Sequence, residues 1–191
     1  MRKLESMFLL NKDDIVRIFN SNILYEKHSF FVIESESREY RTDYRFKSLV
    51  DYAKYIEESY KSGLTVLVKN LELFSKKIAN EALNYGEFVD VHMYLVPSGC
   101  NTSFDFHCDD CPVSIRMIYG KKKFEIKKDD GEIVSHLLRE GDKLDIDYPL
   151  EHRATPEGAS CLLSFGRRGE LSYQIGQFFG DINFSSEVGV K

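Results

Sequence analysis

Hydrophobic and polar positions alternate in short runs from residue 86 onward, which is typical of β-strands with one buried face. Turn-forming sequences such as Pro97-Ser98-Gly99 and Glu140-Gly141-Asp142 separate these runs. The pattern predicts strands at residues 88–96, 103–108, 114–127, 132–137, 143–147 and 160–166. Many short strands at close spacing favour a sandwich or a jelly roll. We therefore expect a mainly β fold.

The first part of the chain mixes helical and strand patterns. Asn11 precedes a short apolar run at helical spacing, which predicts a capped helix. Residues 47–60 and 72–85 repeat apolar side chains at helical spacing, so we expect two amphipathic helices there. The runs 30–33 and 64–68 are β-prone. The sequence thus predicts helices that flank the β-rich part.

Composition and charge narrow the class of protein. The chain has 191 residues, of which 42% are hydrophobic and 30% charged, so we expect one globular domain over 1–191. A net charge of −5 argues against a broad nucleic-acid-binding surface. No apolar run approaches the roughly 20 residues of a membrane span, and the apolar run at 7–10 is short for a secretory signal. We expect a cytoplasmic protein.

The four cysteines allow two interpretations. Cys108 and Cys111 have a CxxC spacing and Cys100 lies nearby, which suggests structural zinc. No fourth ligand or second paired motif accompanies them, so reduced free thiols are the favoured interpretation. The sequence assigns no role to these thiols.

His107 and Asp109 are the strongest candidates for chemistry. Two residues apart in a strand, their side chains point to the same face. His152, from a distant strand, can complete a set of two histidines and one carboxylate, which leaves open positions on iron(II). Taken alone, a His-x-Asp pair is most often a surface or hydrogen-bonded pair.

Lys122 is the second candidate. Alternation places it with Phe124 on the apolar face of the 114–127 strand, and a buried lysine needs an anionic partner. A co-substrate carboxylate can supply that partner. If Gly120 causes no bulge, the same alternation turns Arg116 inward, where it can clamp a substrate carboxylate. A structural pair of Arg116 with an acidic neighbour is the favoured alternative.

Several segments, in this order, resemble the JmjC-type cupin-fold oxygenases, particularly their ribosomal-oxygenase branch. The similarity spans just over half of the chain, from residue 63 to 166. The matching segments are 63–68, 91–99, 106–110, 118–124, 138–144 and 162–166, with His152 at the distal histidine position. The resemblance implies a double-stranded β-helix (jelly-roll or cupin) core over 63–166, an N-terminal extension over 1–62 and a tail over 167–191.

The resemblance also implies roles for individual residues. His107, Asp109 and His152 would hold iron(II), and Lys122 would pair with the distal carboxylate of 2-oxoglutarate. Supporting hydrogen bonds would come from Tyr94 and Ser164, whose alternative roles are core packing and a strand hydroxyl. The chain departs from the family at His92, which replaces a usual asparagine. His92 and Arg116 are the substrate-contact candidates.

The expected activity is a dioxygenase reaction that uses O2 and 2-oxoglutarate to hydroxylate a C–H bond. The substrate would be a protein or peptide side chain or a free amino acid. The N-terminal segment and the tail are the candidate surfaces for a homodimer. Two alternatives stay open. One is a metal-dependent cupin enzyme that does not use 2-oxoglutarate, and the other is a non-catalytic cupin that serves as a binding module.

Overall fold

The structure is a computed structural model that describes residues 9–33, 40–41, 46–100 and 104–170. Its helices are α1 (Lys12–Phe19), α2 (Asn22–Glu26), α3 (Leu49–Lys61), the 3-10 helix η1 (Leu71–Leu73) and α4 (Lys76–Ala82). Its strands are β1 (Phe30–Ile33), β2 (Tyr40–Arg41), β3 (Thr65–Val68), β4 (Val89–Val96), β5 (Val113–Tyr119), β6 (Lys121–Lys127), β7 (Ile133–Arg139), β8 (Lys143–Ile146), β9 (Glu151–Pro156) and β10 (Ser160–Arg167). None of these helices has the length and apolar character needed to cross a membrane.

The three longest helices begin at polar caps. Asn11 and Asp14 form a reciprocal capping box at the start of α1. Ser48 accepts a hydrogen bond from Asp51 N in α3, and Ser75 accepts one from Ile78 N in α4. The predicted helix from Asn11 and the predicted helix 47–60 are therefore confirmed as α1 and α3.

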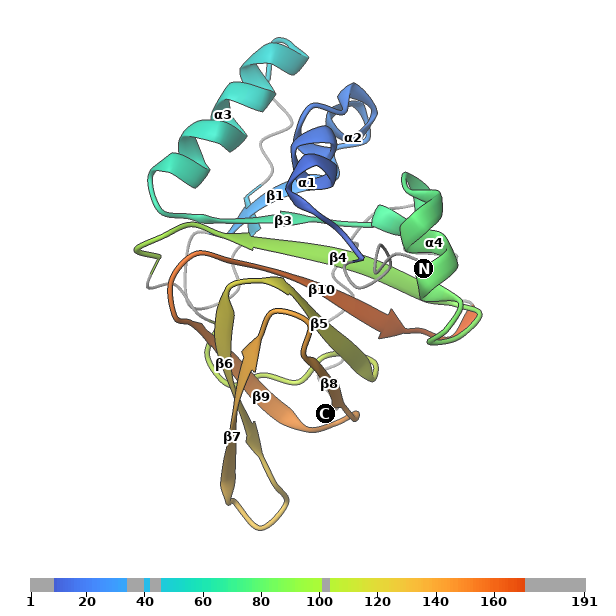
Figure 1. Cartoon of the computed structure of the whole chain (residues 1–191), viewed down its shortest axis with the longest axis vertical. Coiled ribbons are helices and arrows are strands. Elements are labelled where there is room, and N and C mark those ends of the chain that lie inside the picture. The colour runs from blue at the N-terminus through green and yellow to red at the C-terminus, as the bar shows by residue number, and fades with distance from the viewer. Residues whose placement is uncertain (1–8, 34–39, 42–45, 101–103, 171–191) are drawn as a thin grey trace, which may run out of the picture.

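Two antiparallel sheets form the body of the molecule (Figure 1). The larger sheet has the strand order β2-β1-β3-β4-β10-β5-β8, and the smaller has the order β7-β6-β9. From β4 onward the chain passes repeatedly from one sheet to the other, and His107 forms a bridge to β9 between β4 and β5. This winding is a double-stranded β-helix, the jelly-roll or cupin core predicted from the sequence. Strands β1, β2 and β3 extend its larger sheet.

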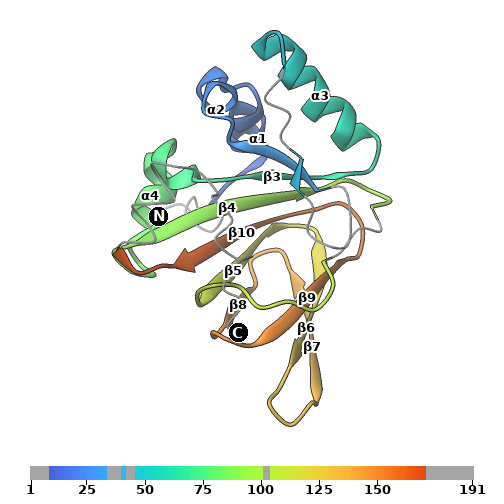
Figure 2. The same ribbon diagram turned by 180° about the vertical axis from the view of Figure 1, so that it is seen from behind.

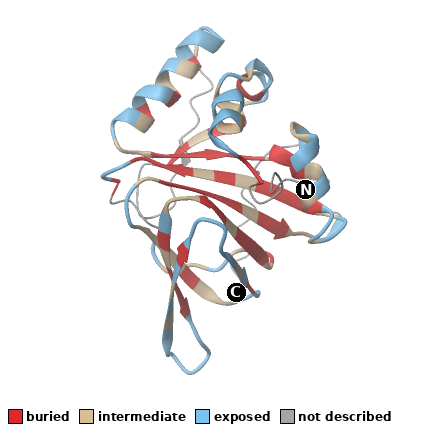
Figure 3. Cartoon of the chain, viewed as in Figure 1, coloured by how far each residue is buried: buried red, intermediate tan, exposed pale blue. Residues whose placement is uncertain are grey.

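Two hydrophobic clusters lie on opposite faces of the larger sheet. The outer cluster joins the helices to that sheet and includes Tyr52, Ile56 and Met93. Figure 2 shows the helices gathered over this face. The inner cluster lies between the two sheets and includes Met117 and Phe124. Burial is deepest along the central strands, whereas the far end of the β6–β7 hairpin is exposed (Figure 3).

Several predicted boundaries are wrong. The run 114–127 is two strands in different sheets, β5 and β6, joined at Gly120. Of the predicted strand 103–108, the described part, 104–108, has only the single bridge at His107. Ser75 caps a new helix, so 72–85 is split between η1 and the short α4. Strand β9 and helix α2 were not predicted.

The close packing at the Gly120 turn should make this glycine important for stability. Gly120 has φ +76°, and a Cβ there would lie 2.3 Å from the carbonyl oxygen of Ala159. Gly141 has a similar φ, +89°, and a Cβ at that residue would have no neighbour within 4 Å. We expect Gly120→Ala to lower the free energy of unfolding by about 3 kcal/mol, because backbone strain and overpacking add. Gly141→Ala should cost only the strain, about 1 kcal/mol.

Denaturant unfolding of both variants measures this difference. Because the two glycines share the left-handed conformation, their difference isolates the close approach of Gly120 to Ala159. Equal losses of stability in the two variants would show that this approach contributes nothing.

Candidate metal site

His107 and His152 face each other across a closed pair of backbone hydrogen bonds. His107 N donates to His152 O over 3.0 Å, and His152 N donates to His107 O over 2.8 Å. Residues paired in this way in an antiparallel ladder project their side chains to the same face. The two imidazole rings accordingly lie 4.5 Å apart, centroid to centroid. One bridge thus brings together two histidines that are far apart in the sequence.

Each histidine ring is oriented by a backbone carbonyl. Nδ1 of His107 lies 2.7 Å from Asp105 O, and Nδ1 of His152 lies 3.2 Å from Leu150 O. A carbonyl can only accept, so each Nδ1 carries a proton. In both rings Nε2 is therefore the nitrogen that is left to bind a metal.

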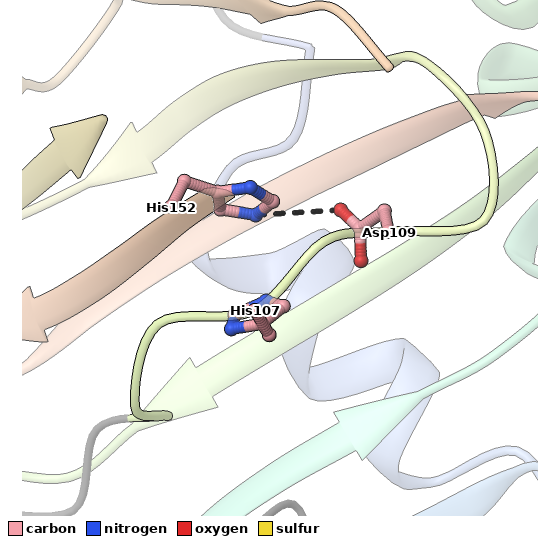
Figure 4. Close-up of side chains that lie close together, drawn as sticks. All are labelled: His107, Asp109 and His152. Atoms are coloured by element: carbon pink, nitrogen blue, oxygen red, sulfur yellow. Dashed lines mark ion pairs between the residues drawn. The ribbon is translucent and has the colours of Figure 1, made fainter. Parts of the chain in front are cut away.

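Asp109 supplies the third donor. Its Oδ2 lies 3.4 Å from Nε2 of His152, and one donor atom each of His107, Asp109 and His152 falls within 4.8 Å of the others. Figure 4 shows the three side chains converging from β9 and from the loop that carries His107 and Asp109. Two imidazole nitrogens and one carboxylate form a donor set suited to a divalent transition metal with open coordination positions. The structure therefore brings the three predicted ligands together.

Lys122 lies inside the barrel, as its alternation predicts. It is 7% exposed, and its side chain shares the inner face of β6 with Phe124. Burial lowers the pKa of Lys122 to about 8, and the ionisable groups that act on it are the thiols of Cys100 and Cys161. In the part of the chain that the structure describes, no carboxylate lies within ion-pair distance of its amine. Lys122 is thus a buried cation without a carboxylate partner among the described residues.

The register of the smaller sheet places Lys122 and His152 on one face. Lys122 pairs with Pro156, and Ile126, four residues along β6, pairs with His152. At the rise of a strand the two positions are about 14 Å apart along the sheet. Lys122 therefore lies deeper in the same interior as the candidate metal site.

Two aromatic rings lie between the amine and the histidines. The Lys122 amine is 6.0 Å from the centroid of the Tyr94 ring, which meets Phe104 edge-on at 6.4 Å. Phe104 meets His107 edge-on at 5.6 Å. This row of contacts links the predicted 2-oxoglutarate residues Lys122 and Tyr94 to the metal ligands. The sequence did not assign a role to Phe104, whose contact depends on a loop conformation that no local pattern encodes.

His92 and Ser164 are neighbours on the inner face of the larger sheet, where they are paired across β4 and β10. Nε2 of His92 lies 3.6 Å from Oδ2 of Asp90. Burial lowers the pKa of His92 to about 4, and the nearby Asp90 opposes that shift. A neutral His92 can donate or accept a hydrogen bond inside the barrel. His92 and Ser164 thus both line the interior. Ser164 is paired directly with His92, whereas Tyr94 is paired with Leu162.

Arg116 does not point into the barrel, so its predicted orientation is wrong. Its Nη1 donates to Oε1 of Glu81 in α4 over 2.5 Å. Ile115 and Met117 take the inner face of β5 instead. The turn at Gly120 reverses the alternation between β5 and β6. The structure shows the alternative left open by the sequence, a structural pair of Arg116 with an acidic neighbour.

A shallow depression opens beside the ligands. It has about 150 Å³ of open space and is lined by Asp109, Cys111, Val113, Ile146, Asp147, Tyr148, Leu150 and His152. Tyr148 and Asp147 form its exposed rim. The depression is too small for a peptide, and it borders the candidate ligands Asp109 and His152.

The four cysteines are free thiols. Cys111 is buried, and burial raises the pKa of its thiol to about 12. The exposed Cys108 donates from Sγ to Pro149 O over 3.0 Å. A protonated, buried Cys111 is a poor zinc ligand, because zinc binds the thiolate. The structure agrees with the interpretation of Cys108 and Cys111 as free thiols beside the candidate ligands His107 and Asp109.

Comparison with known proteins adds little to this geometry. The sequence matches no protein-family model and no curated protein. Among solved structures it is similar to oxalate decarboxylase from Bacillus subtilis, in a study of its Mn(II) centres, with 22% identity over 55% of this chain and a TM-score of 0.39. This chain spans 25% of the length of that enzyme. A conserved Streptococcus pyogenes protein of unknown function matches with 11% identity, over 44% of this chain and 68% of its own, at a TM-score of 0.37.

Proposed function

We propose that this protein is a metal-dependent cupin enzyme whose metal is held by His107, Asp109 and His152. The donor atoms support this proposal: two imidazole nitrogens and one carboxylate oxygen lie within 4.8 Å of one another in a jelly-roll interior. Three protein ligands leave positions for a substrate and for oxygen, which is the arrangement of catalytic rather than structural metal sites.

The finer proposal is an Fe(II)- and 2-oxoglutarate-dependent oxygenase of the JmjC-like type. Lys122 is the observation that carries it, since a buried amine without a protein carboxylate is a ready partner for an anionic co-substrate. Its position, on the same interior face as His152, suits a molecule that bridges from the metal to the amine. Bound iron would supply the activation of O2 that protein side chains cannot perform.

Four further side chains would line the site and exclude water from it. Tyr94 and Phe104 would line the passage from the metal to Lys122 and exclude water from it. Ser164 and His92 would offer hydrogen bonds on the opposite wall, within the larger sheet. We propose residues 63–166 as the catalytic core and a protein side chain, peptide or amino acid as the substrate whose C–H bond is hydroxylated.

Anaerobic titration with iron(II) and 2-oxoglutarate, followed by measurement of succinate after O2 is added, tests the proposal. We expect one iron per chain and succinate formation that a pool of peptides or amino acids stimulates. Iron binding without 2-oxoglutarate consumption would instead favour a metal-dependent cupin enzyme of another type. A protein that binds no metal would be a non-catalytic cupin module, which contradicts both levels of the proposal.

A further inference from the structure

The segment that carries Asp109 is held to the barrel on both sides of that residue. Backbone hydrogen bonds fix it at His107, through the bridge to His152, and at Pro112, whose carbonyl accepts from Arg167 N over 3.0 Å. Side chains add further contacts: the Arg153 guanidinium lies 4.6 Å from the centroid of the Phe106 ring. Asp109 itself lies between these fixed points, in a stretch without regular secondary structure.

Arg168 reaches this stretch from the end of β10. Its Nη1 donates to Oδ2 of Asp110 over 2.6 Å, and its Nε donates to Oδ2 of Asp90. Its backbone N–H donates to Phe88 O over 2.9 Å, which fixes it beside the start of β4. One guanidinium therefore ties the residue after Asp109 to the larger sheet. Guanidinium–carboxylate contacts of this kind are directional as well as strong.

Asp90 is a rigid anchor for this link. It is 7% exposed and lies within β4. A Cβ on Gly166 would lie 2.3 Å from Oδ1 of Asp90 and 3.2 Å from Sγ of Cys111, so the carboxylate occupies space that only glycine leaves open. The neighbouring strand thus accommodates Asp90, and Asp90 in turn holds Arg168.

Asp109 faces His152, whereas Asp110 faces Arg168. Because the two aspartates are adjacent, the bond from Arg168 to Asp110 restrains the backbone next to Asp109 and so limits the directions in which Asp109 can project. The positive charge of Arg168 also offsets the repulsion among the nearby carboxylates of Asp90, Asp109 and Asp110.

We propose that Arg168 is a positioning residue of the metal site, which orients Asp109 by binding Asp110 and Asp90. The inference rests on the proposed metal-binding function. It gives a role to the network of Arg168, Asp90 and Asp110, whose residues take no direct part in the proposed reaction. Outer partners that orient a ligand typically contribute 10–100-fold to metal affinity.

Asp110→Ala is the deciding variant, because the Asp110 side chain is 73% exposed and its loss leaves the Arg168–Asp90 pair intact. We expect its affinity for Mn(II), used alone as a probe and titrated by EPR, to fall about 10-fold. Asp110→Asn keeps an acceptor for Arg168 and should restore most of that affinity. Asp147→Ala is the matched control, since it removes one exposed carboxylate from the rim of the same depression.

Hydrogen exchange of the metal-free protein supplies a readout that does not depend on activity. Amides 108–112 should exchange faster in Asp110→Ala and at the wild-type rate in Asp147→Ala, with the melting temperature unchanged in both. Arg168→Lys should weaken Mn(II) binding further, although the poorer pairing of the buried Asp90 carboxylate also lowers stability. Equal Mn(II) affinity in wild type, Asp110→Ala and Asp147→Ala would overturn the role of Arg168. A wild-type protein that binds no Mn(II) would instead overturn the proposed function itself.

Discussion

Replacing Asp109 by alanine should leave a folded protein that no longer retains iron(II). Asp109 supplies the anionic donor of the three, and its side chain is 25% exposed, so its loss removes little packing. Loss of an outer partner already costs 10–100-fold in metal affinity, so we expect loss of this direct ligand to cost more than about 100-fold. Anaerobic iron(II) titration should show the loss of binding, and 2-oxoglutarate turnover should fall to background.

Asp129→Ala is the control for this experiment, because it removes one negative charge from the exposed β6–β7 turn. Its metal affinity should equal that of the wild type. His107→Ala should behave like Asp109→Ala, since His107 supplies another of the donor atoms. Wild-type iron binding in either ligand variant would exclude this cluster as the metal site.

The candidate ligands could be predicted because their chemistry is visible in residue type and order. His152 was identified even though β9 was not recognised as a strand. The inner positions of β9 are His152, Ala154 and Pro156, so the strand lacks the strongly apolar alternation that marks its neighbours. A candidate metal ligand thus stands where strand prediction depends on a hydrophobic residue.

Alternation predicted Lys122 correctly and Arg116 incorrectly for the same physical reason. Side-chain direction alternates only within one continuous strand. Lys122 and Phe124 belong to β6, whereas Arg116 belongs to β5, and the left-handed Gly120 between them reverses the phase. The sequence contained that glycine, but nothing local distinguishes a bulge in one strand from a corner between two sheets.

The contacts of Arg168 with distant segments could not be predicted from the sequence. Arg168 is 58 residues from Asp110 and 78 residues from Asp90, and each residue taken alone is an ordinary surface charge. Only the fold brings β4, the end of β10 and the loop that carries Asp109 and Asp110 together. Packing of the jelly roll, rather than any motif, therefore defines the surroundings of the candidate site.

The second large effect is expected from replacing Lys122. Its charged amine is buried in the metal-free protein, which lowers the stability of the folded state. With its pKa lowered to about 8 from 10.5, the charged amine destabilises the folded state by on the order of 3 kcal/mol at pH 7. That penalty is complete below the folded pKa of about 8 and disappears as the pH rises toward the unfolded value of 10.5. Lys122→Met should therefore stabilise the metal-free protein at pH 7, and much less at pH 10.

The same substitution should have the opposite effect on co-substrate binding. Without the amine, the distal carboxylate of 2-oxoglutarate would be buried unpaired, which costs about 3–4 kcal/mol, or 100- to 1,000-fold in Kd. Wild-type affinity should also fall as the pH rises past about 8, where the amine becomes neutral, and Lys122→Met should lack this pH dependence. Lys123→Met is the matched control, because Lys123 lies on the outer face and pairs with Glu125.

Calorimetric titration of both variants with 2-oxoglutarate, alongside thermal unfolding, separates the effect on co-substrate binding from the effect on stability. If Lys122→Met bound 2-oxoglutarate as tightly as Lys123→Met, the buried amine would have another purpose, and a metal-dependent cupin reaction without 2-oxoglutarate would be the better account of this site.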